Sequence, residues 1–122
     1  MPNATYVLVD LPESLLLAQY YLGSKRTRFL VPNEIDQLEK ADIVVNIYSF
    51  AEMTPDIVKE YYKQFDRVQA KFFYSRNRDL ETNVVDKVSV DVHKLLPKKW
   101  TVVRKEQSRV WPDFYDMYVK LR

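Results

Sequence analysis

The apolar and polar positions of this chain form short apolar runs separated by amphipathic stretches. Apolar runs predict strands at 5–9, 29–31, 42–48, 71–75, 100–104 and 114–121. Helical spacing predicts helices at 12–22 and 54–68, and a short helix or turn at 33–39. Strands that alternate with helices favour right-handed crossovers and a parallel sheet. The last two strands, joined through 108–113, predict an antiparallel hairpin, so we expect a single α/β domain over 1–122.

The two longer predicted helices differ in how their apolar residues are distributed. Thr54-Pro55-Asp56 is a helix start, with Thr54 as the N-cap. The residues that follow place one apolar face at helical spacing: Ile57, Val58, Tyr61, Tyr62, Phe65 and Val68. By contrast, Ser14–Leu22 is apolar nearly all the way round and ends at Gly23. We therefore expect this first helix to be covered on more than one side.

The stretch 41–56 is the centre of the predicted organisation. Ile43-Val44-Val45 is a β-branched run of the kind expected in a strand buried on both faces. The segment from Asn46 to Met53 has neither helical nor strand periodicity. In open α/β sheets, the loop that leaves the carboxyl end of a strand binds ligands. An ordinary strand–loop–helix connection explains the same pattern. The candidate functional residues are Asn46, Tyr48, Ser49, Phe50 and Glu52.

Residues 80–99 carry no decisive pattern. The alternation of Val88, Val90 and Val92 is compatible with a strand, and His93–Leu96 with a turn of helix before Pro97. The number of elements between the strands at 71–75 and 100–104 therefore stays open.

Composition narrows the classes of function. The 122 residues carry a net charge of +2, which by itself does not indicate binding to nucleic acid or to a membrane surface. The sequence has no cysteine, which excludes thiolate catalysis and zinc–thiolate sites, and its acidic residues lack metal-ligand spacing. No apolar run approaches the roughly 18 residues of a membrane span, so a soluble cytoplasmic protein is expected. The single glycine, Gly23, excludes a glycine-rich phosphate or dinucleotide loop.

Four segments carry a resemblance to a known family: VLVDLPE at 7–13, FLVPN at 29–33, DIVVNIYSFAEM at 42–53 and KFFYSRN at 71–77. Together they resemble the class I S-adenosylmethionine-dependent methyltransferases, and more narrowly the sugar O-methyltransferase family. The resemblance spans most of 5–80. It implies a Rossmann-like sheet, mostly parallel, with an antiparallel carboxyl-terminal hairpin and helices on both faces. It also implies S-adenosyl-L-methionine as the cofactor.

The same resemblance shows what has no counterpart here. The family begins with a strand, a glycine-rich turn and a helix, and that turn holds the methionine part of the cofactor. The first strand of this chain corresponds to the second strand of the family. The sequence therefore resembles the carboxyl-terminal part of such an enzyme, without the first β–α unit.

Three residues near the start of the chain fall where the family contacts the nucleoside. Asp10 ends its strand at the position of the acidic residue that binds the ribose hydroxyls, and a helix-capping role is compatible with this. Leu11 would flank the adenine, with a simple core position as the more ordinary explanation. Asn33 offers the donor and acceptor that the adenine edge needs, although asparagine is also common in plain turns.

The central stretch would supply both the cofactor site and the acceptor site. The resemblance places Asn46 and Tyr48 beside the sulfonium of the cofactor, and Ser49 and Phe50 on the acceptor side.

Three further residues are candidates for contact with the acceptor. Glu52 could take a proton from an attacking hydroxyl if burial raises its pKa, but it could equally cap the next helix or pair with a lysine. Asn77 and Arg78, expected after the strand at 71–75, could bind sugar hydroxyls or be solvated loop residues.

Two functions remain open. The first is S-adenosylmethionine-dependent methyl transfer to a hydroxyl, such as that of a sugar, or a truncated form of such an enzyme. The second is a non-catalytic Rossmann-like binding or assembly module. The first reading requires Asp10 and Asn46 to open onto one hollow shaped for a nucleoside.

The absence of a counterpart to the first strand of the family also affects which partners we expect. In the full fold that strand lies between the strands at 5–9 and 42–48, so these must pair directly, leave a gap, or be completed by another chain. Exposed hydrophobic edges are association sites, so we expect a homo-oligomer or completion by another chain. A small-molecule substrate is the other expected partner.

Overall fold

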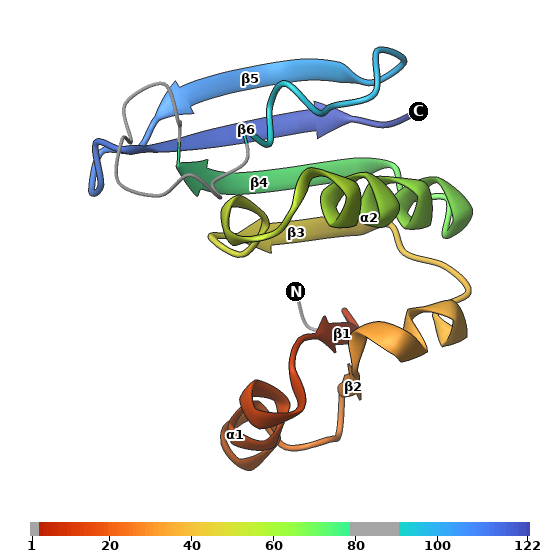
Figure 1. The fold of residues 1–122 in the computed structure, drawn as a ribbon. Coiled ribbons are helices and arrows are strands. Elements are labelled where there is room, and N and C mark those ends of the chain that lie inside the picture. Colours follow the sequence, from red (N-terminus) through yellow and green to blue (C-terminus); the bar gives the residue numbers. More distant parts are fainter. Residues whose placement is uncertain (1–2, 79–90) are drawn as a thin grey trace. The chain divides into compact units, whose positions relative to one another are not determined.

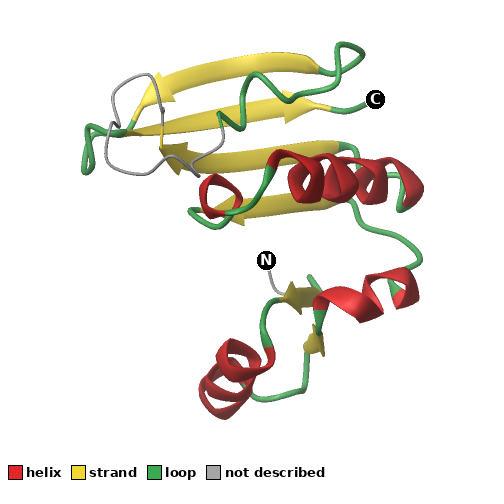
Figure 2. Ribbon diagram, in the orientation of Figure 1, coloured by secondary structure: helices red, strands yellow, loops and turns green. Residues whose placement is uncertain are grey.

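The computed structural model describes residues 3–78 and 91–122, drawn in colour in Figure 1. The chain divides into two compact units, Met1–Glu39 and Lys40–Arg122. Each unit has its own sheet, and Figure 2 shows where helices and strands fall in each. The described elements are therefore of the mixed α/β class, as the sequence predicts.

The first unit is built on two parallel strands. Strand β1 (Tyr6–Val9) pairs with β2 (Thr27–Leu30), in a register that joins Tyr6 to Thr27 and Val9 to Leu30. Helix α1 (Pro12–Leu22) connects them, and the 3₁₀ helix η1 (Pro32–Gln37) follows β2. Both strands therefore end at the same edge of this small sheet.

Helix α1 begins and ends as predicted, but its burial differs from the prediction. Pro12 occupies the first turn, and Gly23, with φ of 64°, ends the helix by donating its N–H to the Gln19 carbonyl at 3.0 Å. Leu15 is the one buried residue of the helix, whereas Leu16 and Tyr20 are 70% and 83% exposed. The prediction of cover on more than one side is wrong for these residues, because the two short strands of this unit offer too little apolar surface.

The second unit is a four-stranded mixed sheet in the order β3-β4-β6-β5. Strand β3 (Ile43–Ile47) pairs in parallel with β4 (Phe72–Arg78), and β6 (Phe114–Lys120) pairs antiparallel with both β4 and β5 (Thr101–Gln107). The antiparallel carboxyl-terminal hairpin is confirmed. Strand β1 belongs to the sheet of the first unit and β3 to the sheet of the second.

Helix α2 (Pro55–Arg67) covers one face of this sheet (Figure 1). Its apolar stripe buries Val58, Tyr62 and Phe65, as the helical spacing predicts. The Phe65 and Phe73 rings lie 5.1 Å apart, and the Tyr62 and Trp100 rings also lie 5.1 Å apart. This aromatic core joins the helix to β4 and to the segment before β5. Helices on both faces of a sheet are not confirmed by the described residues.

Strand β3 corrects a second expectation. It is the edge strand of its sheet, and Ile43, Val45 and Ile47 are each more than half exposed. Asn46, by contrast, is buried. The run was expected to be buried on both faces, but an edge strand with a helix on one side buries only alternate residues.

Strands β4 and β6 are also joined by a side-chain network. Arg76 and Asp116 lie opposite each other in the register. Arg76 donates from Nε to Asp116 Oδ1 at 2.6 Å and from Nη2 to Oδ2 at 3.0 Å. The Tyr74 hydroxyl donates to the same Oδ1 at 2.6 Å. This bidentate pair fixes the register of the two strands.

The first part of the unpatterned region, 80–90, lies outside the described residues, including Val88 and Val90. Val92 is buried, and His93–Leu96 form a turn. None of the helices in the described part of the chain is long and apolar enough to cross a membrane.

Candidate functional site

The carboxyl end of β3 leads into a tight turn before α2. Tyr48 follows the strand with φ of 68°, a conformation that non-glycine residues rarely adopt. Its N–H donates to the Arg76 carbonyl at 2.7 Å, which continues the β3–β4 ladder by one residue. The 3₁₀ helix η2 (Phe50–Glu52) comes next. Left-handed backbone at a strand end requires support from its surroundings, and it is often found at binding sites.

A buried amide supplies part of that support. Asn46 donates from Nδ2 to Ser49 Oγ at 2.6 Å, and its Oδ1 accepts the Phe50 N–H at 3.3 Å. The same Oδ1 accepts from Asn77 Nδ2 at 3.0 Å. The Asn46 side chain therefore holds the turn in place from inside the protein.

Asn77 completes this network from β4. It is fully buried, donates from Nδ2 to Ser75 Oγ at 2.7 Å, and accepts the Ala51 N–H on its Oδ1 at 3.3 Å. The expectation that Asn77 and Arg78 follow the strand is wrong, because β4 extends to Arg78. Polar residues can occupy this inner strand because their side chains find partners on neighbouring elements.

Phe50 and Glu52 lie in opposite environments. Phe50 is 3% exposed, and its ring lies within 6.2 Å of the rings of four core residues: Tyr61, Tyr62, Phe65 and Phe73. Phe50 therefore anchors η2 in the core. Glu52 is exposed, so the described structure does not supply the burial on which its proposed base role depends. Ser49 is exposed beside it.

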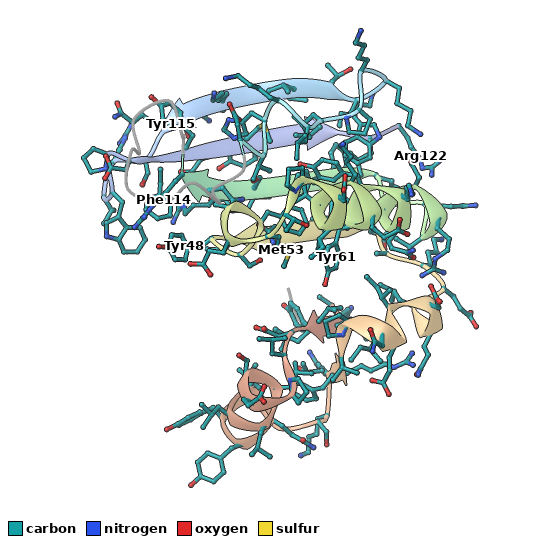
Figure 3. The ribbon with its side chains drawn as sticks, in the orientation of Figure 1. Tyr48, Met53, Tyr61, Phe114, Tyr115 and Arg122 are labelled. Carbon is teal, nitrogen blue, oxygen red and sulfur yellow. The ribbon has the colours of Figure 1, made fainter. Side chains whose placement is uncertain are left out.

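An aromatic–arginine cluster lies at the same end of the sheet, formed by Tyr48, Arg78, Phe114 and Trp111. The Arg78 guanidinium carbon lies 5.1 Å from the Tyr48 ring centroid and 5.6 Å from that of Phe114. Figure 3 shows Tyr48 and Phe114 close together, with ring centroids 5.2 Å apart. Trp111 adds a ring 5.8 Å from Phe114. Among the described residues, the buried Arg78 Nε has no hydrogen-bond partner.

Sequence reasoning missed Phe114 and Trp111 as neighbours of the candidate site. The antiparallel pairing of β4 with β6 sets Arg78 directly opposite Phe114. The signal present in the sequence was Trp111-Pro112 in the hairpin loop, but the loop could be tied to Arg78 only once the register was known.

The first unit brings its own candidates to one edge. Asp10 and Leu11 follow β1 and Asn33 lies in η1 after β2, so all three are at the carboxyl ends of parallel strands. Asp10 Oδ1 accepts the N–H of the adjacent Leu11 at 2.7 Å. Leu11 is the N-cap of α1 and no side chain caps the helix, so a capping role of Asp10 is not confirmed. All three residues are exposed, with Leu11 at 61%.

The candidates therefore fall into two groups, one in each unit. Whether Asp10 and Asn46 open onto one hollow stays a prediction. Within residues 3–78 and 91–122, no group of three or more histidine or acidic residues could hold a metal ion.

Comparison with known proteins shows a likeness in fold to a solved structure. No family model matches the chain, and no curated protein matches it. A crystal structure described as a "putative type 11 methyltransferase" from Sulfolobus solfataricus is similar over 95% of this chain and 70% of its own length. Its TM-score is 0.66 at 10% sequence identity. At that identity the likeness concerns the fold alone, so the chain has a methyltransferase-like α/β fold.

Proposed function

We propose that this chain belongs to a protein that transfers a methyl group from S-adenosylmethionine to a hydroxyl, with a sugar as the proposed acceptor. The observation that carries the proposal is the turn after β3, where Tyr48 is left-handed and the buried Asn46 and Asn77 bind each other and the residues that follow Tyr48. Such a turn at the carboxyl end of parallel strands is where open α/β sheets bind ligands. The methyltransferase-like fold supports this reading.

The first unit is proposed to bind the nucleoside part of the cofactor. One carboxylate oxygen of Asp10 accepts the Leu11 N–H, and the second is available to the ribose hydroxyls. The exposed Leu11 side chain offers an apolar surface for adenine, and the exposed Asn33 offers a donor and an acceptor for its edge. For the methionine part, the sequence contains no glycine-rich turn, since its one glycine ends α1.

The second unit is proposed to position the acceptor. S-adenosylmethionine, when bound, supplies an electrophilic methyl group. Tyr48 and Ser49 are exposed on the turn, and the Arg78 guanidinium lies beside the Tyr48 ring, so these three are proposed to orient the acceptor hydroxyls. Asn46, Asn77 and Phe50 would act indirectly, by fixing the turn. Positioning of this kind supplies most of the rate in an in-line displacement.

The acceptor hydroxyl must lose its proton as its oxygen forms the new bond to carbon. Glu52 is the carboxylate nearest in sequence to the Tyr48 turn, and it is the proposed proton acceptor. Glu52 is exposed, so closure of the site over bound substrate would have to exclude water from it.

A second function is favoured by a specific observation. A chain with one glycine cannot form the cofactor loop of the family that it resembles. A non-catalytic binding or assembly module with the same fold needs no such loop, and it would retain the buried amide network for structural reasons alone.

Calorimetric titration of the full chain with S-adenosylhomocysteine distinguishes the two functions. If the methyltransferase reading is right, binding is saturable and Asp10→Ala abolishes it, because the ribose loses its carboxylate partner. Asp36→Ala, which removes another exposed carboxylate of the same unit, should leave binding unchanged. No heat at about 1 mM ligand, a concentration that detects even weak sites, would favour the module.

A further inference from the structure

The loop between β5 and β6 carries an exposed tryptophan at one edge of the second sheet. Trp111 is 54% exposed, whereas Trp100, the other tryptophan of the chain, is buried. The loop lies beside the last residue of β4, because Arg78 pairs with Phe114 at the start of β6. The loop therefore shares an edge with the carboxyl ends of the parallel strands β3 and β4, which is where open α/β sheets bind ligands.

The backbone around Trp111 is held in a defined turn. The Phe114 N–H donates to the Trp111 carbonyl at 2.9 Å, and the Trp111 N–H donates to Ser108 Oγ at 3.3 Å. Ser108 is itself buried, and Gln107 Nε2 donates to the Pro112 carbonyl at 2.7 Å. A rigid indole on an ordered turn loses little conformational freedom when a ligand binds, so Trp111 is suited to stacking.

The ring of Trp111 adjoins residues that the proposed function assigns to the acceptor. Phe114 lies between them, with its ring centroid 5.8 Å from that of Trp111 and 5.2 Å from that of Tyr48 (Figure 3). The Arg78 guanidinium carbon lies 5.6 Å from the Phe114 centroid. The aromatic–arginine cluster thus combines apolar ring faces with N–H and O–H groups, the combination that small-molecule sites use for affinity and orientation.

We propose that Trp111 stacks against the ring of the acceptor, and that the acceptor is a pyranose sugar bound through its C–H face. The face of an indole ring carries partial negative charge, so it attracts the partially positive C–H bonds of a pyranose. Hydroxyls at the rim of the sugar both donate and accept, so they match the guanidinium of Arg78 and the hydroxyl of Tyr48. This inference rests on the proposed transfer to a sugar hydroxyl, and it gives a role to Trp111 that the proposed function does not assign.

Methyl β-glucopyranoside is the probe, because its ring hydrogens are axial and form two C–H faces. In saturation-transfer NMR of the full chain, irradiation of the protein's aromatic protons should give the largest signal at these ring protons. The signal should saturate over about 1–100 mM glucoside, the range of a weak site. Sorbitol has similar hydroxyls but no ring, so it should give no such signal. The glucoside should also protect Trp111 from quenching by acrylamide, whereas sorbitol should not.

Substitutions assign the signal to Trp111. Trp111→Ala should weaken glucoside binding by about fivefold or more, because the stacking surface is lost. Trp111→Phe keeps a ring and should retain most of the binding. Tyr20→Ala removes an exposed aromatic residue of the first unit, and this control should bind the glucoside as the wild type does. Saturation transfer follows binding in all three variants, since it does not depend on tryptophan fluorescence.

Three results would overturn the proposal: no saturable binding of the glucoside, binding unchanged in Trp111→Ala, or an equal loss in Tyr20→Ala. Titration with S-adenosylhomocysteine separates these results from the proposed function. A chain that binds S-adenosylhomocysteine but not the glucoside retains the cofactor site and loses the stacking role. A chain that stacks the glucoside on Trp111 but does not bind S-adenosylhomocysteine retains the sugar site, and the methyl transfer fails instead.

Discussion

At the scale of single residues, Asp116 gives the structure a defined response to acid. The hydrogen bonds from Arg76 hold the pKa of Asp116 below its ordinary value. A carboxylate with a lowered folded-state pKa contributes stability that is present above the unfolded value of about 3.9 and is lost as pH falls through the folded value. Asp116→Asn should therefore lower the free energy of unfolding by about 2 kcal/mol at pH 7 and flatten its decline below pH 4, measured by urea unfolding.

A second ion pair of the same unit provides the control. Lys71 Nζ lies 3.1 Å from Asp42 Oδ1, but both side chains are more than half exposed. Exposed pairs contribute little, so Asp42→Asn should cost less than about 0.5 kcal/mol. Equal losses for the two variants would show that burial of Asp116 does not strengthen its pair with Arg76.

The candidate site shows how far residue-level prediction reaches. The sequence identified Asn46 and Asn77 as polar residues near strand ends, and both lie there. It could not show that they bind each other, because that contact spans 31 positions and depends on the parallel register of β3 and β4. The burial of Phe50 was missed for the same reason, since an aromatic residue in a loop has no period that reveals its neighbours.

At the scale of elements, strong periodicity predicted the elements and their buried faces well. Short apolar runs predicted the ends and the burial of strands less well. The one-sided pattern of α2 and the closing hairpin were both confirmed. The end of β4 was placed too early because Arg76-Asn77-Arg78 is polar, although partners across the sheet satisfy Arg76 and Asn77. The burial of β3 was overestimated because apolar composition does not distinguish an inner strand from an edge strand.

The end of α1 gives a prediction at this scale. Gly23 combines φ of 64° with ψ of −179°, a conformation that is essentially restricted to glycine. An added Cβ would meet nothing within 4 Å, so the cost of Gly23→Ala comes from the backbone alone. It should destabilise α1 by about 1–3 kcal/mol, measured by far-ultraviolet circular dichroism during urea unfolding. Ser24→Ala, at the exposed next position, should change stability by less than about 0.5 kcal/mol; an equal effect would refute the backbone explanation.

At the scale of the whole molecule, the two units differ in how much apolar surface they bury. Within residues 3–39 the buried apolar side chains are Leu15 and Leu30. The second unit buries an aromatic core that includes Tyr62, Phe65 and Phe73. Units of about 40 residues rarely build a sufficient core alone. The first unit should therefore unfold at a lower denaturant concentration than the second.

The chain carries natural probes for this difference. Both tryptophans, Trp100 and Trp111, lie in the second unit, so their fluorescence reports that unit, whereas circular dichroism reports helices in both. In urea, we expect an early transition in circular dichroism that tryptophan fluorescence does not show. Leu15→Ala should shift the early transition and Val58→Ala the later one, each by about 2 kcal/mol or more because both side chains are buried. Coincident transitions, shifted together by either substitution, would show instead that the units unfold as one cooperative structure.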